Sequence, residues 1–213
     1  MDKLYEIDNN GLVRQKEYQI IQYKEEYLDV RYRSYGQNTV YMSYLRLGFL
    51  LGVVKENISS ILDFGCGTGD FLKVASLKIP NTYSYDIIDH NYKFAKKIEK
   101  VEDIYKMQLD VVTFFDSLEH VTDPYEIIRN INTEYIFISV PWCHLKTKGE
   151  KWFMNWKHRR YNEHLWHFDL ESLSKFFKSF GYDLIKFSNF EDIISQNSLD
   201  YQNILSCIFQ KNR

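Results

Sequence analysis

The chain contains few of the residues that mark several large protein classes. Its 213 residues include only three cysteines, three prolines and nine glycines. The cysteines, Cys66, Cys143 and Cys207, are too few and too scattered for a disulfide framework or a zinc cluster. No repeat and no stretch rich in proline and glycine divides the sequence. We therefore expect a single domain over residues 1–213 in a reducing, cytoplasmic setting.

Strong charge and long apolar runs are also lacking. The formal net charge of −2 gives no electrostatic argument for nucleic acid or a membrane surface as partner. The longest apolar stretch, residues 45–54, contains Arg46 and is too short to span a bilayer. Residues 1–6 lack the apolar core of a signal peptide. We expect no membrane association.

Aromatic residues, in contrast, are abundant. They make up 17% of the chain, with 17 tyrosines and 15 phenylalanines. Such a composition is typical of a core packed with aromatic rings, and it also suits aromatic walls around a substrate pocket. Composition does not choose between these two interpretations.

Short apolar runs alternate with amphipathic segments in the middle of the chain. Because these runs are apolar on both faces, they indicate parallel strands covered by helices on each side. The predicted strands cover residues 58–64, 82–88, 109–115 and 135–140, and the predicted helices cover 71–77, 92–100 and 124–131.

The two ends of the chain have a different pattern. Helical spacing over residues 18–32 and 39–54 predicts an N-terminal helical cap formed by residues 1–54. Near the C-terminus, an irregular segment over 142–168 precedes a helix over 170–180, which ends at a glycine. Two strands follow, over 182–187 and 203–209, and their short connection favours antiparallel pairing.

A glycine-rich turn follows the first predicted strand, in the run Asp63-Phe64-Gly65-Cys66-Gly67-Thr68-Gly69. Glycines let the backbone approach a ligand closely and adopt positive φ angles. In the dinucleotide-binding fingerprint, the third glycine comes one residue later, where this chain has Asp70. The spacing therefore disfavours a dehydrogenase.

Residues 61–69 resemble the first motif of class I S-adenosylmethionine-dependent methyltransferases, in the small-molecule branch that includes ubiquinone and sugar methyltransferases. Residues 109–124 are similar to that family's fourth strand and following loop, and residues 136–141 to its fifth strand. The usual Pro-Gly-Gly turn before the fifth strand is missing, and the third strand would be compressed into residues 102–104.

The resemblance covers about residues 55–190 and implies a fold. This is an α/β, Rossmann-like fold with a seven-stranded, mostly parallel sheet in the order 3-2-1-4-5-7-6, whose last strand is antiparallel. Helices cover both faces. Residues 55–213 would form this core, and residues 1–54 would be an N-terminal helical extension.

The resemblance also implies S-adenosyl-L-methionine as cofactor. Asp63, Gly65, Cys66 and Gly67 would hold its amino acid end, and Asp116 would border the methyl group. The carboxylate of Asp86 can accept both ribose hydroxyls, and Ile87 would pack against the adenine.

Methyl transfer requires alignment of donor and acceptor and, for some acceptors, removal of a proton. The candidate bases are His164, Glu163 and His120. His120 follows the fourth predicted strand, whereas Glu163 and His164 lie in the run 161–168 before the helix over 170–180. Glu163 and His164 resemble the Tyr-x-Glu-His run of sugar C-methyltransferases. Alternatively, they form a capping and packing pair for the next helix.

A basic, aromatic segment over 142–160 begins the stretch 142–168, which we expect to be a substrate lid. Alternatively it is a solvated lid with tryptophans anchored in the core. The predicted acceptor contacts are Trp142, His144, Tyr161 and His167. The favoured acceptor is a small molecule, anionic or sugar- or nucleotide-like. Two alternatives remain: a nucleic-acid methyltransferase acting on RNA more than DNA, or a cofactor-binding, non-catalytic partner subunit.

A metal interpretation also applies to the loop after the fourth strand. Asp116, Glu119 and His120 place two carboxylates and an imidazole within five residues. The same Glu-His pair occurs in family members that have no metal, so we expect none here.

Overall fold

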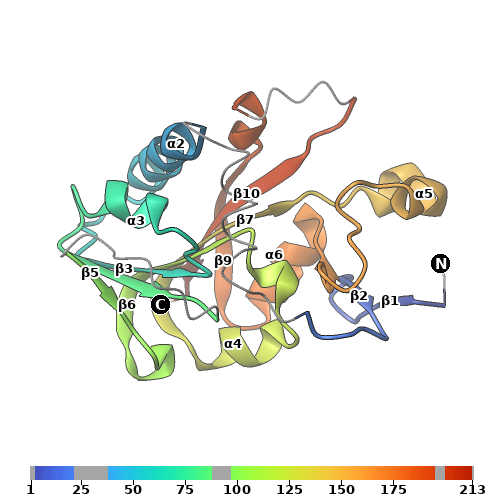
Figure 1. Cartoon of the computed structure of the whole chain (residues 1–213), viewed down its shortest axis with the longest axis horizontal. Coiled ribbons are helices and arrows are strands. Elements are labelled where there is room, and N and C mark those ends of the chain that lie inside the picture. Colours follow the sequence, from blue (N-terminus) through green and yellow to red (C-terminus); the bar gives the residue numbers. More distant parts are fainter. Residues whose placement is uncertain (1–2, 22–37, 88–96, 195–199, 213) are drawn as a thin grey trace.

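A seven-stranded sheet forms the centre of the molecule (Figure 1). The computed structural model describes residues 3–21, 38–87, 97–194 and 200–212. The strand order confirms the prediction 3-2-1-4-5-7-6. In spatial order the strands are β5 (Ile98–Lys100), β4 (Asn81–Tyr85), β3 (Ser60–Phe64), β6 (Gln108–Phe115), β7 (Asn132–Pro141), β10 (Ile204–Lys211) and β9 (Tyr182–Ser188).

The strand directions also follow the prediction. β5, β4, β3, β6 and β7 run parallel to one another. β10 pairs antiparallel with both β7 and β9, with an irregularity in its register between Ile208 and Phe209. The carboxyl ends of β3, β4 and β6 therefore meet at one edge, where ligands bind in open α/β sheets.

Helices cover both faces of the sheet because side chains alternate along each strand. On β6, Val111 and Phe115 face α2 (Asn38–Val53) and α3 (Asp70–Ala75) in one apolar cluster. The side chains of Val112 and Phe114 join the opposite cluster with α4 (Pro124–Asn130) and α6 (Leu170–Lys178). The run 109–115, predicted to be apolar on both faces, is therefore buried on both faces.

The N-terminal region differs from the prediction. β1 (Tyr5–Ile7) and β2 (Val13–Gln15) form an antiparallel hairpin, and β2 pairs with β8 (Trp166–His167). The helical cap predicted over 1–54 is therefore wrong over these strands. The Oδ1 atom of Asp8 accepts hydrogen bonds from the backbone N–H groups of Asn10 and Leu12, which shapes the turn.

The second predicted cap helix is confirmed as α2. The first, over 18–32, lies outside the described residues from 22 onward, and residues 18–21 have no regular secondary structure.

The third core strand lies earlier in the sequence than expected. β5 occupies residues that were predicted to end a helix over 92–100, of which residues 92–96 lie outside the described part. Residues 102–104 are not a strand, because Ile104–Lys106 form a 3-10 helix capped by the side chain of Asp103. β5 is an edge strand, and its polar residues Glu99 and Lys100 are typical of such a position.

The segment predicted as irregular, 142–168, contains regular structure. Besides β8 it includes α5 (Leu145–Met154), which is kinked at Gly149, where φ is 80°. The two ends of the segment meet, since Cys143 N donates to Phe168 O at 2.8 Å. No helix in the described part of the chain is long and apolar enough to cross a membrane.

Candidate cofactor and acceptor site

The glycine loop lies at the carboxyl end of β3 and leads into α3. Gly65, Gly67 and Gly69 all have positive φ angles, of 78°, 50° and 70°, which L side chains rarely adopt. A Cβ atom on Gly65 would lie 2.6 Å from the Cβ atom of Ser117. The loop therefore requires glycine at position 65 for both its backbone conformation and its close approach to the segment after β6.

Asp86 follows β4 and holds the loop from the neighbouring strand. Its Oδ2 atom accepts a hydrogen bond from Gly67 N at 2.8 Å, and Tyr85 O accepts from Gly65 N at 2.8 Å. Ile87, the predicted adenine contact, has 68% of its surface exposed. The structure thus brings Asp86, which the family resemblance implies as the ribose contact, to the loop.

Asp63 lies beneath the loop and is almost fully buried, with 3% exposed. Its Oδ1 atom accepts a hydrogen bond from the Thr113 hydroxyl at 2.6 Å. Burial raises the pKa of Asp63 to about 6, although Thr113 and the positive charge of Arg46 act in the opposite direction. Burial also raises the pKa of the Cys66 thiol, which makes it a poor nucleophile.

Asp116 follows β6 in a left-handed conformation, with φ 51°, and half of its side chain is exposed. One oxygen of Asp116 lies 3.5 Å from the guanidinium of Arg46, which comes from α2. Arg46 also makes two hydrogen bonds to Glu191, at 2.8 and 2.7 Å, and its guanidinium carbon lies 4.2 Å from the centre of the Phe115 ring. Helix α2 is therefore tied to the same edge of the sheet.

Arg46 and Glu191 were not among the residues predicted from the sequence to lie at the site. A single arginine within the apolar run 45–54 was the available signal for Arg46. Burial opposes its charge, but the carboxylates of Glu191 and Asp116 outweigh burial and raise the pKa of Arg46. Glu191 lies in the 3-10 helix Phe190–Ile193, a polar connection that gave no sequence signal.

Two of the three candidate bases lie together. The rings of His120 and His164 are 4.7 Å apart and nearly perpendicular, and Glu119 lies beside them. Burial lowers the pKa of His164 far below its usual range, and His120 and His167 lower it further. Glu163 instead forms an ion pair with Arg160, at 2.7 Å.

The four predicted acceptor contacts do not form one group. His167 is buried and packs against Tyr5, Phe153 and Trp156. Burial lowers its pKa to about 3. Tyr161 has 48% of its surface exposed.

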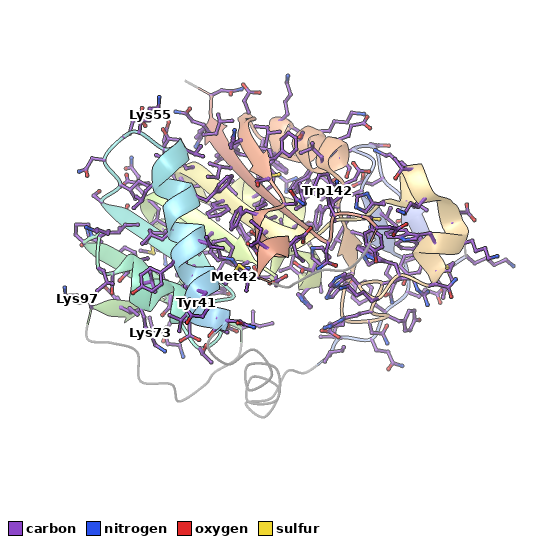
Figure 2. All side chains as sticks on the ribbon, turned by 90° about the horizontal axis from the view of Figure 1, so that it is seen from above. Tyr41, Met42, Lys55, Lys73, Lys97 and Trp142 are labelled. Atoms are coloured by element: carbon purple, nitrogen blue, oxygen red, sulfur yellow. The ribbon has the colours of Figure 1, made fainter. Side chains whose placement is uncertain are left out.

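Trp142 and His144 stack, with ring centres 5.4 Å apart. His144 also contacts Trp152 and Tyr201, and its Nε2 lies 2.8 Å from Gln202 O, so this nitrogen donates. In Figure 2, Trp142 lies on the α5 side of the sheet, whereas Tyr41 and Met42 mark one end of α2 on the opposite side.

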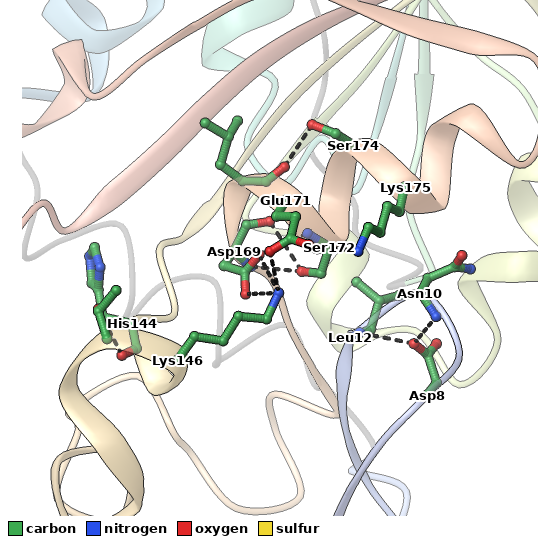
Figure 3. A network of polar contacts seen from close by, with 12 residues as sticks. Asp8, Asn10, Leu12, His144, Lys146, Asp169, Glu171, Ser172, Ser174 and Lys175 are labelled. Carbon is green, nitrogen blue, oxygen red and sulfur yellow. Dashed lines mark hydrogen bonds and ion pairs between the residues drawn. The ribbon is translucent and has the colours of Figure 1, made fainter.

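Several positive charges of the segment 142–160 have acidic partners. Lys146 lies 3.0 Å from Asp169 and 3.1 Å from Glu171, across the start of α6 (Figure 3). Lys148 pairs with Asp200 at 3.1 Å. Two of the aromatic residues, Phe153 and Trp156, are buried in a cluster with the N-terminal hairpin. The ion pairs of Lys146 and Lys148 reduce the positive charge that the sequence of this segment suggested.

A hollow of about 410 Å³ lies elsewhere, between the β1–β2 turn and the start of α4. Its lining includes Arg14, Asp123 and Trp166 and none of the predicted cofactor or acceptor residues.

The strand order, the glycine loop and the acidic residue after β4 define a class I, Rossmann-like methyltransferase fold. A family model described as "Methyltransferase domain" matches residues 32–186, more than half of the chain. The chain belongs to this family. A search of curated protein sequences finds no match.

Solved structures show the same fold at low sequence identity. A chain of the complex that contains the Haloferax volcanii Trm112 methyltransferase activator is 10% identical, with a TM-score of 0.64, covering 92% of this chain and 100% of that one. The plantazolicin methyltransferase BpumL, in complex with S-adenosylhomocysteine and a triazolic desmethyl-plantazolicin analogue, is 17% identical, with a TM-score of 0.59, covering 88% and 91%. A Mesorhizobium loti S-adenosylmethionine-dependent methyltransferase is 14% identical, with a TM-score of 0.55, covering 77% and 96%.

S-adenosylmethionine is the cofactor of this family, and the residues present fit it. The loop is held at positive φ and turns its backbone toward the carboxyl edge of the sheet. The carboxylate after β4 is fixed beside that loop, where ribose hydroxyls can be accepted.

Proposed function

We propose that this protein transfers the methyl group of S-adenosylmethionine to a small-molecule acceptor. The observation that carries the proposal is the hydrogen bond from Gly67 N to Asp86, which joins the glycine loop to the acidic end of the next strand. The bound cofactor supplies a methyl group already activated on a sulfonium. The protein's own task is to bind and align the two reactants.

In this proposal, Asp63 and the backbone of Gly65, Cys66 and Gly67 hold the amino acid end of the cofactor. Asp86 accepts the ribose hydroxyls, the exposed side chain of Ile87 covers the adenine, and Asp116 borders the methyl group. Asp63 would act in its ionised form, because a carboxylate attracts the positively charged amino group.

For an acceptor that must lose a proton, His120 is the base that the geometry favours. Glu163 is engaged with Arg160, and the low pKa of His164 makes it a weak base. His120 is half-buried next to His164, which can orient its ring. Segment 142–168 would cover the acceptor, with Trp142 and His144 as stacking groups.

The partial neutralisation of the segment 142–160 supports a small acceptor over nucleic acid. Binding to a phosphate backbone depends on cations that can contact several phosphates, and here Lys146, Lys148 and Arg160 are paired with carboxylates. A nucleic-acid acceptor and a non-catalytic partner subunit become outcomes of the test below.

The test supplies the protein and S-adenosylmethionine carrying a labelled methyl group to a cell extract. We expect label in the small-molecule fraction, and turnover reduced at least tenfold in His120→Asn if the acceptor must lose a proton. Label in RNA or DNA that disappears after nuclease treatment would support the nucleic-acid alternative. Absence of label from every fraction, with cofactor binding intact, would favour a non-catalytic subunit.

A further inference from the structure

Four of the chain's six histidines are near neighbours in the fold. The ring of His164 lies 4.7 Å from that of His120, 6.3 Å from that of His158 and 6.4 Å from that of His167. Glu119 lies beside two of these histidines. Glu119, His120 and His164 each offer one ligand atom, and the three atoms lie within 4.8 Å of one another. This arrangement joins the loop after β6 to the residues just before β8.

Backbone contacts fix the two segments that carry these side chains. Leu165 N donates to Glu119 O at 2.8 Å, and the indole N–H of Trp166 donates to Val121 O at 3.0 Å. These bonds join Glu119 and the residue after His120 to the two residues that follow His164. A site whose side chains stand on such paired segments keeps its geometry without a ligand.

The ring nitrogens of His164 indicate that this cluster binds a ligand. It is 2% exposed, and neither ring nitrogen has a hydrogen-bond partner among the residues that the structure describes. Buried polar atoms are normally satisfied.

The cluster also contains a buried carboxyl group. Glu119 is 1% exposed, so its oxygens face other protein groups rather than solvent. The guanidinium of Arg160 forms an ion pair with Glu163. The cluster therefore brings one carboxyl group and two imidazoles into one small volume.

We propose that Glu119, His120 and His164 bind one divalent transition-metal ion. Two imidazole nitrogens and one carboxylate oxygen suit Zn²⁺, Mn²⁺ or Fe²⁺ better than Mg²⁺ or Ca²⁺, which favour oxygen ligands. At metal–ligand distances of about 2.1 Å, the ligand atoms would lie no more than about 4.2 Å apart. Small side-chain rotations would bring the three atoms to that separation, and further coordination positions would stay open.

The proposed ligands differ from the set considered from the sequence alone, which comprised Asp116, Glu119 and His120. In the structure, Asp116 is half exposed and lies near Arg46, and His164 takes its place in the cluster. Metal binding by these residues does not depend on methyl transfer. If the ion is present, His120 acts as a ligand rather than as a base.

The test is direct metal binding by the full chain after treatment with a chelator. Calorimetric titration with Zn²⁺ should give one ion per chain, and Co²⁺ should give a visible absorption band of a low-coordinate site. Mg²⁺ should bind more weakly. Glu119→Gln and His120→Asn should each weaken Zn²⁺ binding at least about tenfold, since each removes a ligand.

His144→Gln is the matched control. It removes a half-buried imidazole that bonds to Gln202 O, outside the cluster, and should leave Zn²⁺ affinity unchanged. Circular dichroism establishes that each variant is folded. Failure of folded wild-type protein to bind any of these ions overturns the proposal, as does Zn²⁺ binding that survives in folded Glu119→Gln and His120→Asn. Zn²⁺ binding in a protein that does not bind S-adenosylhomocysteine would refute the proposed function and leave the metal site standing.

Discussion

Replacing Arg46 with methionine should destabilise the protein strongly. The guanidinium makes two hydrogen bonds to Glu191, and the side chains of the pair are only 13% and 3% exposed. Methionine keeps much of the apolar length over Phe115 but leaves the carboxylate of Glu191 buried without its cation. Breaking a buried ion pair in this way costs about 3–5 kcal/mol of unfolding free energy.

For a domain of this size, each kcal/mol corresponds to about 2–4 °C in Tm, so Tm should fall by roughly 6–20 °C. Thermal and urea unfolding followed by circular dichroism measure this change. The double variant Arg46→Met/Glu191→Gln should recover part of the loss, because it removes the isolated charge. Lys175→Met, which breaks an exposed ion pair with Glu171, is the control and should leave Tm nearly unchanged. Equal, small effects of Arg46→Met and Lys175→Met would refute the reasoning.

Two further predictions concern the cofactor loop. Gly65→Ala should weaken S-adenosylhomocysteine binding at least about tenfold. An L-residue in the left-handed conformation costs about 1–2 kcal/mol, and relief of the close contact with Ser117 adds to that cost. Unchanged calorimetric affinity would contradict this. Burial raises the pKa of Asp63 from 3.8 to about 6 in the folded protein. Protonated Asp63 therefore stabilises the fold fully below pH 3.8, the pKa in the unfolded chain, and this stabilisation is lost as pH rises through about 6. Compared with Asp63→Asn, the wild type should lose up to about 3 kcal/mol between about pH 4 and pH 7 in urea titrations; parallel pH curves would show that Asp63 does not titrate in this way.

The core of the fold could be predicted because its signals are local. Apolar runs buried on both faces, such as residues 109–115, indicate central parallel strands whatever surrounds them. The glycine loop was evident from the spacing of its glycines, and Asp86 came from the family resemblance; the structure joins them through Gly67 N. The strand order came from the resemblance to a family rather than from the residues themselves.

The other parts of the structure could not be predicted, because they depend on tertiary contacts that leave no local pattern in the sequence. β1 and β2 are three residues each, and they are stable as strands because β2 pairs with β8, about 150 residues later in the chain. β5 is an edge strand whose polar residues suit a helix equally well. Likewise, the pairing of Arg46 with Glu191 brings together a helix and a loop that are distant in the sequence.

The measurement that tests the central claim most directly is calorimetric titration of the full chain with S-adenosylhomocysteine. We predict binding in the micromolar range, weaker binding in Asp86→Asn, and none in Gly67→Arg, whose side chain would fill the space that the loop leaves for the cofactor. A folded wild-type protein that gives no binding heat with either S-adenosylhomocysteine or S-adenosylmethionine would contradict the account.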